Sequence, residues 1–268
     1  MRPTVLIGSS IPPGLDQVQL HQRLKLGDLV LTALPTDRQE ALAVAGFCRQ
    51  HGIRLLFSEF VYRGSGAPSP AWRRAIAREE FFSKAEIDAI LDAAGDAFLG
   101  RMTLGEAGGI LYWPEAYVSR LGPHCWHKLK ACSTQDEAQS AYVETCRRTL
   151  EYEHREIGRG PLLDVDSSLV FKYHAMAGVD ILCLESMPGD PHLMHAAIRG
   201  AARAYDKPWG THIAMGWYGG VDLDALYQKR WTTALLHAYL AGAEFIYPES
   251  GHYTYENPRR GLRFGFGS

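Results

Sequence analysis

The sequence lacks the features that mark several classes of protein. Neither sign of charge dominates, because 28 Lys and Arg residues balance 30 Asp and Glu residues and leave a formal net charge of −2. A nearly neutral chain has no basic surface to attract nucleic acid or an anionic membrane, so neither is an expected partner. The apolar share is 46% and the charged share is 22%, which argues against disordered and fibrous classes.

Cysteine and long apolar runs are also scarce. The five cysteines are an odd number without a Cys-x-x-Cys pair, so neither a disulfide framework nor a zinc knuckle is indicated. No apolar run approaches the ~18 residues of a membrane span, and the first residues lack the apolar core of a signal peptide. We therefore expect a cytoplasmic protein, or a secreted one if the chain is a processed or trimmed piece.

Three apolar segments of strand length each end on a glutamate and a flexible loop. They cover residues 98–106, 180–185 and 244–249, and they end on Glu106, Glu185 and Glu249. A carboxylate at the end of a buried strand gives up solvent unless something polar meets it there. Three such endings point to a polar ligand at one place.

The order of predicted elements indicates an eight-stranded β/α barrel, a TIM barrel. The strand-length runs lie at 4–10, 28–34, 53–60, 98–106, 162–165, 180–185, the start of 207–220, and 243–249. Helical patterns alternate with most of them, and runs that are apolar on both faces belong to a parallel sheet covered on both sides. A doubly wound sheet is the alternative, but the loop after the first strand is a poor phosphate-binding turn.

The barrel is expected to lack a regular closing helix in this chain. Residues 250–268 contain turn residues and aromatics but no apolar helical period. We predict that residues 1–268 form a single catalytic domain, with the possibility that it is the N-terminal part of a longer protein.

The three glutamates are expected at one end of this barrel. Active sites of such barrels lie at the C-terminal ends of the strands, and the inward side chains of one layer come from alternate strands. Glu106, Glu185 and Glu249 end the fourth, sixth and eighth strands. They are therefore predicted to share a layer.

Carboxylates in a cleft walled by aromatic rings suit the cleavage of a glycosidic bond. One carboxyl protonates the leaving oxygen, while another stabilises or attacks the oxocarbenium-like centre. The predicted substrate-binding residues are Glu59, Trp113, Asp166, His212, Trp217, Tyr218, Tyr247 and His252. Among these, Trp217 and Tyr218 are expected to line the sugar site, because they stand where the seventh strand opens into a glycine-rich loop.

Two short segments carry a family resemblance. Over most of its length the chain resembles the β/α-barrel glycoside hydrolases of the clan-A type, in which the acid/base glutamate closes strand four. Gly105-Glu106 stands at that place, and Lys207-Pro-Trp209 resembles the segment that leads to the clan's nucleophile on strand seven. The sequence then departs from the clan, because residues 211–214 contain no carboxylate. The second carboxylate is then Glu185 or Glu249, unless the strand count is off by one, which would make Glu249 the residue that ends strand seven.

We predict Glu106 as the general acid/base, Glu185 as its first-choice partner and Glu249 as the second choice. Glycines at positions 105, 108 and 109 leave room for a sugar beside Glu106. Two further glutamates nearby would raise its pKa, as a proton donor requires. Such a hydrolase acts on a carbohydrate and needs neither a metal ion nor another cofactor.

Two other functions use the same residues. Glu106, Glu185, His212 and Glu249 offer ligands for a divalent metal, as in barrel sugar isomerases and epimerases that look similar at their strand ends. A barrel that binds carbohydrate without catalysis is the third hypothesis. No feature of the sequence predicts an oligomeric state.

Overall fold

The computed structural model describes residues 5–59, 82–104, 106–108, 132–157, 159–187, 189–214 and 226–249, together with 256–257 and 262–263. Within these ranges, residues 58–59, 156–157, 227 and the last two pairs are described by their backbone only.

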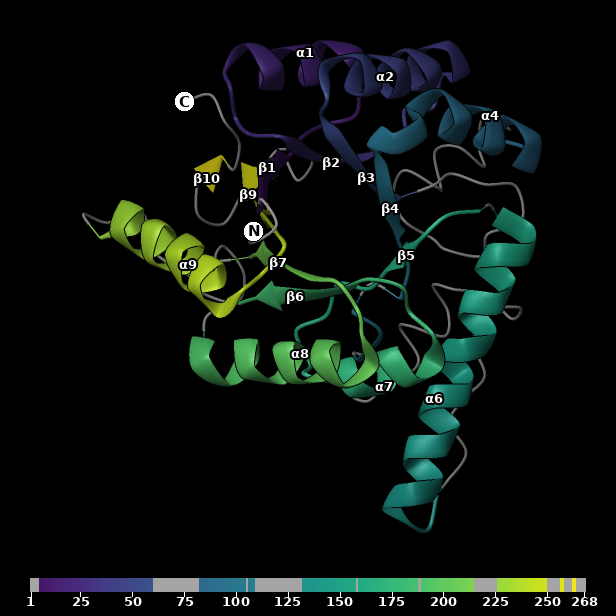
Figure 1. The fold of residues 1–268 in the computed structure, drawn as a ribbon, viewed down its shortest axis with the longest axis vertical. Coiled ribbons are helices and arrows are strands. Elements are labelled where there is room, and N and C mark those ends of the chain that lie inside the picture. Colours follow the sequence, from purple (N-terminus) through teal and green to yellow (C-terminus); the bar gives the residue numbers. More distant parts are fainter. Residues whose placement is uncertain are drawn as a thin grey trace.

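Eight parallel strands form a nearly closed barrel (Figure 1). They are β1 (Leu6–Ser10), β2 (Leu29–Ala33), β3 (Arg54–Glu59), β4 (Phe98–Met102), β5 (Leu162–Leu163), β6 (Leu182–Ser186), β7 (Trp209–Ile213) and β8 (Phe245–Pro248). Their order is β5-β4-β3-β2-β1-β8-β7-β6, with β1 paired to both β2 and β8. The predicted TIM barrel is confirmed.

The remaining seam, between β5 and β6, is joined by isolated bridges. Leu163 pairs with Ile181 and Asp166 pairs with Leu184, both in parallel. The backbone N–H of Glu185 donates to the carbonyl of Asp166 at 3.0 Å, which extends this pairing to the C-terminal end of the barrel. The loop after β5 is therefore fixed to the end of β6, where the active site is expected.

Helices surround the strands in Figure 1. They are α1 (Leu15–Arg23), α2 (Arg38–His51), α4 (Lys84–Ala94), α6 (Gln135–Tyr152), α7 (Phe171–Ala177), α8 (Pro191–Tyr205) and α9 (Tyr227–Ala241), with the short helical turns η1 (Gly95–Ala97) and η3 (Glu153–Ile157). Ser83 begins α4 with a capping box to Glu86, as its sequence predicts. Among the described residues that follow β8, the structure has only two short antiparallel strands, β9 (Glu256–Asn257) and β10 (Leu262–Arg263).

Alternate strand residues fill the barrel interior. This interior cluster includes Leu29, Leu31, Leu56, Leu163, Val165, Ile181, Cys183, Phe245 and Tyr247. Gly210 on β7 makes room for the ring of Phe245, because a Cβ at this glycine would lie 2.3 Å from a ring atom. Two larger clusters pack the outer face of the barrel against the helices.

A buried polar network ties α6 and α7 to the seam of the barrel. His174 Nδ1 lies 2.5 Å from a carboxylate oxygen of Asp164, and its Nε2 lies 2.7 Å from the hydroxyl of Tyr142. The other oxygen of Asp164 accepts the N–H of Cys183 on β6 at 3.0 Å. Burial lowers the pKa of His174, but its interactions with Asp164 and Cys146 together outweigh burial and raise that pKa well above its usual value.

Candidate active site

The ends of β6, β7 and β8 bring ionisable side chains to the interior of the barrel. Glu185 lies two residues after Cys183, and Glu249 lies two residues after Tyr247, so both continue the inward rows of their strands. His212 on β7 pairs in register with Glu185 on one side and with Tyr247 on the other. These side chains therefore meet at the C-terminal end of the strands.

Glu106 reaches the same end from a turn and not from a strand. The sequence predicted one strand from residue 98 to Glu106, but β4 ends at Met102. Leu104 and Glu106 have positive φ angles of 46° and 52°, which no β-strand accommodates. The backbone N–H of Glu106 donates to the carbonyl of Val165 at 2.6 Å, so the turn is fixed to the residues after β5.

Asp166 holds this turn in place. One carboxylate oxygen accepts the N–H of Gly108 at 2.7 Å, and the other accepts the N–H of Ser168 at 2.5 Å. Gly108 leaves no space for a side chain, since its Cβ would lie 2.4 Å from Cβ of Ser168. Asp166, which the sequence predicted to bind substrate, is fully buried, and its two hydrogen bonds fix the turn that carries Glu106. Its contact with a substrate stays a prediction.

One of the two hydrogen bonds of Asp166, the bond to Ser168, has a local signal in the sequence, which the sequence analysis missed. An Asp whose side chain accepts the N–H two residues later forms an Asx turn, and Asp166-Ser-Ser168 has the composition of one. The partner on the other loop, Gly108, has no comparable signal. Its contact depends on how two loops approach in space.

Glu185 has a pKa far above the ordinary value of a glutamate. Burial is the largest cause of a pKa raised to about 9, and the nearby charges of Glu106, Glu249 and Asp166 contribute to the same increase. A hydrogen bond with the side chain of Glu106 is the smallest of these contributions. Glu185 is only 6% exposed, and it therefore keeps its proton at neutral pH.

Several buried polar atoms of the site lack a hydrogen-bond partner within the described part of the chain. They are Oε2 of Glu185 and both ring nitrogens of His212. His212 Nε2 lies 3.8 Å from Oε1 of Glu249, which is too far for a hydrogen bond. Buried polar groups are normally hydrogen-bonded, so these atoms mark a place where a polar ligand would supply the missing partners.

Tyr247 was expected among the rim aromatics, but it lies below the carboxylates in the barrel interior. It is 0% exposed, and its ring stacks on Phe245 with centroids 6.3 Å apart. The rings of Tyr247 and His212 meet nearly at a right angle, with a centroid distance of 4.9 Å. Tyr247 therefore packs against the ring of His212.

The other predicted substrate contacts are placed only in part. Glu59 is the last residue of β3, described by its backbone. Trp113, Trp217, Tyr218 and His252 lie outside the described residues. In the described ranges, no three His, Cys, Asp or Glu side chains are arranged to hold a metal ion. None of the helices in those ranges is long and apolar enough to cross a membrane.

Comparisons with known proteins show the fold. No family model and no curated protein matches the sequence. A Cellulomonas fimi endo-beta-1,4-mannanase double mutant matches with a TM-score of 0.52 and 13% identity, over 91% of this chain and 64% of the mannanase. A Bacteroides uniformis beta-glucuronidase 2 matches with a TM-score of 0.50 and 9% identity, over 92% of this chain and 30% of that one.

An HpcH/HpaI aldolase from Desulfitobacterium hafniense DCB-2 also matches, with a TM-score of 0.43 and 13% identity, over 91% of this chain and 86% of the aldolase. The mannanase and the glucuronidase, at such low identity, show a common fold alone, because TIM barrels carry many activities. This chain spans less than two thirds of the length of the mannanase.

Proposed function

We propose that the chain is a glycoside hydrolase that cleaves O-glycosidic bonds with paired glutamates at the C-terminal end of the barrel. The observation that carries the proposal is Glu185, a buried carboxyl whose pKa is raised to about 9 beside Glu106 and Glu249. Glycosidic cleavage needs one carboxyl that is protonated and another that is ionised at the same pH. Environments that separate the protonation of neighbouring glutamates provide such a pair.

Glu185 is the proton donor in this proposal. The sequence favoured Glu106 for that role because of its position after the fourth strand. The physical environment favours Glu185, because burial keeps its proton in place at the pH where a leaving oxygen must be protonated. Glu106 and Glu249 are the candidates for the second carboxylate, which acts as nucleophile or as base.

Substitution by alanine assigns these roles when each variant is assayed on two substrates. One is an ordinary glycoside, and the other is an activated glycoside whose leaving group needs no proton. Glu185→Ala should lose most activity on the ordinary glycoside and keep much of it on the activated one. Loss of the true second carboxylate, at Glu106 or Glu249, should abolish both activities.

Glu244→Gln is the matched control, since Glu244 precedes β8 and lies at the opposite end of the strand from Glu249. It should leave both activities unchanged. Equal losses on both substrates for Glu185→Ala would remove it as the proton donor. If activity disappears with a chelator and returns with a divalent metal, the metal-dependent isomerase becomes the better hypothesis and the hydrolase is rejected.

A further inference from the structure

The side chains of Glu106 and Glu185 are in direct contact. A hydrogen bond joins the two carboxyl groups, which places an oxygen of one about 2.5–3 Å from an oxygen of the other. Oε2 of Glu185 is buried and has no partner within the described ranges, so Oε1 makes this bond. Oε2 is therefore the atom of Glu185 that is left to meet a ligand.

This contact bears on which glutamate stands opposite Glu185. In glycosidic cleavage the sugar lies between two carboxyl groups, which are about 5–5.5 Å apart in retaining enzymes and about 6.5–9.5 Å apart in inverting ones. Two carboxyl groups joined by a hydrogen bond leave no room for a sugar between them. The contact therefore favours Glu249 over Glu106 as the second carboxylate.

Glu249 lies beside a buried histidine. Nε2 of His212 is 3.8 Å from Oε1 of Glu249, and the two side chains are only 4% and 10% exposed. Both ring nitrogens of His212 lack a hydrogen-bond partner in the part of the chain that the structure describes. The ring packs edge-on against Tyr247, with centroids 4.9 Å apart, which holds it in this orientation. His212 therefore presents a polar edge to the site at a fixed place.

The separation of Nε2 and Oε1 suits one oxygen atom between them. Such an atom can lie about 2.8 Å from both, which is the usual length of a hydrogen bond. A water molecule can donate one proton to the carboxylate and form a second hydrogen bond with the imidazole. A carboxylate that accepts from a water can take its proton as the water attacks, which is the role of the base in an inverting glycosidase.

We propose that Glu249 is the base of an inverting hydrolysis and that His212, a further catalytic residue, holds the attacking water beside it. This inference rests on the proposed hydrolase function. The oxygen of the water forms a bond to the anomeric carbon, and the bond from that carbon to the leaving oxygen breaks. Glu249 takes a proton from the water, and the pair of Glu106 and Glu185 gives one to the leaving oxygen. The product therefore has the opposite anomeric configuration to the substrate.

The configuration of the first product tests the proposal. A set of nitrophenyl glycosides that differ in the sugar and in its configuration is screened, and cleavage of the best one is followed by proton NMR before the product mutarotates. The first anomeric signal should be that of inversion. Retention would mean that a glutamate attacks the sugar itself, so it would overturn this inference and leave the hydrolase function in place.

A crystal structure without substrate tests the water independently of activity. An ordered water should lie within about 2.6–3.2 Å of both Nε2 of His212 and Oε1 of Glu249, and it should be lost in His212→Phe. A different group bonded to Nε2, or no ordered water at this place, would overturn the inference whether or not any glycoside is cleaved.

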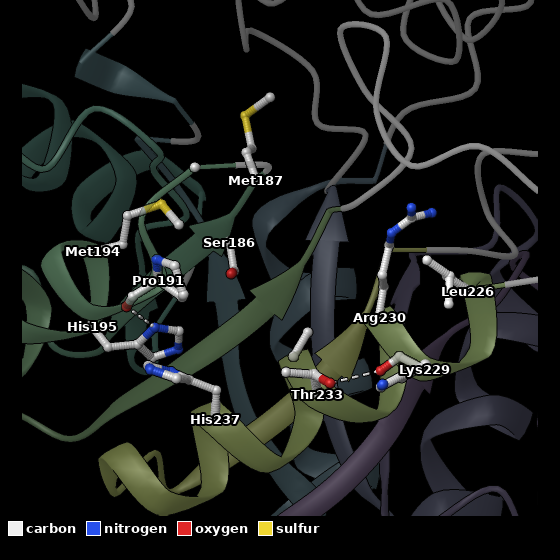
Figure 2. Close-up of a pocket in the computed structure, with 12 residues that line it drawn as sticks. Ser186, Met187, Pro191, Met194, His195, Leu226, Lys229, Arg230, Thr233 and His237 are labelled. Atoms are coloured by element: carbon white, nitrogen blue, oxygen red, sulfur yellow. Dashed lines mark hydrogen bonds between the residues drawn. The ribbon is translucent and has the colours of Figure 1, made fainter. Parts of the chain in front are cut away.

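Variants of His212 measure its part in the reaction. His212→Phe keeps a ring against Tyr247 and should lower kcat about 100-fold, as the loss of one catalytic group does. His212→Gln keeps a group that can bond to the water and should lose less. His195→Gln is the matched control, because this buried histidine lies outside the barrel, with Nδ1 2.8 Å from the carbonyl oxygen of Pro191 (Figure 2). Equal kcat for His212→Phe and the control would overturn the role of His212.

Glu106→Gln separates the two candidate carboxylates. Glutamine can keep the hydrogen bond to Glu185 without the charge, while Glu249, Asp166 and His212 still face Glu185. This variant should stay active at acidic pH, and its alkaline limit of kcat should move to lower pH, because the charge of Glu106 contributes to the raised pKa of Glu185. Glu249→Gln should be inactive at every pH. The reverse result, with Glu106→Gln inactive and Glu249→Gln active, would overturn the inference.

Discussion

Replacing Glu185 by glutamine should stabilise the protein as the pH rises. The pKa of Glu185 is about 9 in the folded protein, against an ordinary value of 4.5. Between these two pH values the folded protein holds a proton that the unfolded chain has released. The stability of the wild-type protein therefore falls with rising pH over this window, from about pH 4.5 to about pH 9.

The size of the effect follows from the shift. Each unit of pKa difference corresponds to about 1.4 kcal/mol, so protonation of Glu185 costs about 3 kcal/mol at pH 7. This is an upper limit, because part of the shift of Glu185 comes from interacting acids, and such a shift is shared between the groups that interact. Glutamine has the same shape without an ionisable proton and removes the cost.

Urea unfolding at pH 5, 7 and 8.5 measures the difference. The free energy of unfolding of Glu185→Gln should be close to that of the wild type at pH 5, and should exceed it increasingly at pH 7 and 8.5. Glu244→Gln should show no such trend. A difference that is constant with pH, or a variant less stable than the wild type at every pH, would refute the reasoning. The gain should accompany a loss of activity, as at functional sites in general.

Three further substitutions test the supports of the site. Asp166→Asn places an amide N–H₂ against the N–H of Gly108 or Ser168, so kcat on an ordinary glycoside should fall roughly 10- to 100-fold. Steady-state kinetics should show no such loss for Asp180→Asn, whose carboxylate accepts the N–H of Leu162 at the other end of the barrel. Gly210→Ala should cost about 1–3 kcal/mol in thermal unfolding by overpacking the barrel, and an unchanged melting temperature would contradict this. His174→Gln should cost about 3–5 kcal/mol in urea unfolding by leaving Asp164 without its partner, and addition of Asp164→Asn should recover part of it, whereas strict additivity would exclude the coupling.

The barrel and two of its glutamates follow from patterns that are local in the sequence. Strand-length apolar runs alternate with helical patterns, and parallel strands covered on both sides need both faces apolar. Glu185 and Glu249 then fall at the ends of such runs, and the period of two fixes their inward direction. Local periodicity is sufficient for these assignments, because no distant contact decides them.

How deep a residue lies in the barrel cannot be predicted from its neighbours in the sequence. Tyr247 and Glu249 point inward from the same strand end, and nothing in their sequence spacing tells which one meets solvent. Depth depends on the register with neighbouring strands, and β7 places His212 beside Tyr247. Tyr247 thus lies in the filled interior of the barrel and stacks on Phe245, although its sequence position resembles that of a rim residue.

Glu106 was misplaced for a different reason. Its apolar context suggests a continuous strand, whereas Leu104 and Glu106 have left-handed backbone conformations that neither residue favours. Such conformations persist only when the surrounding structure holds them. Here the holding groups are Val165 and Asp166, which come from another loop some sixty residues further along the chain and were not recognisable as partners in advance.

The length of β6 explains the raised pKa of Glu185. β6 includes Glu185 within its span, so the barrel wall encloses the carboxyl and removes its water. β4 ends four residues before Glu106, and β8 ends one residue before Glu249, and both of these glutamates are only partly buried. Burial is the largest cause of the raised pKa of Glu185, and the charges of the less buried glutamates come second. The position of Glu185 inside β6, rather than after its end, thus accounts for the burial that raises its pKa, as the proposed role of proton donor requires.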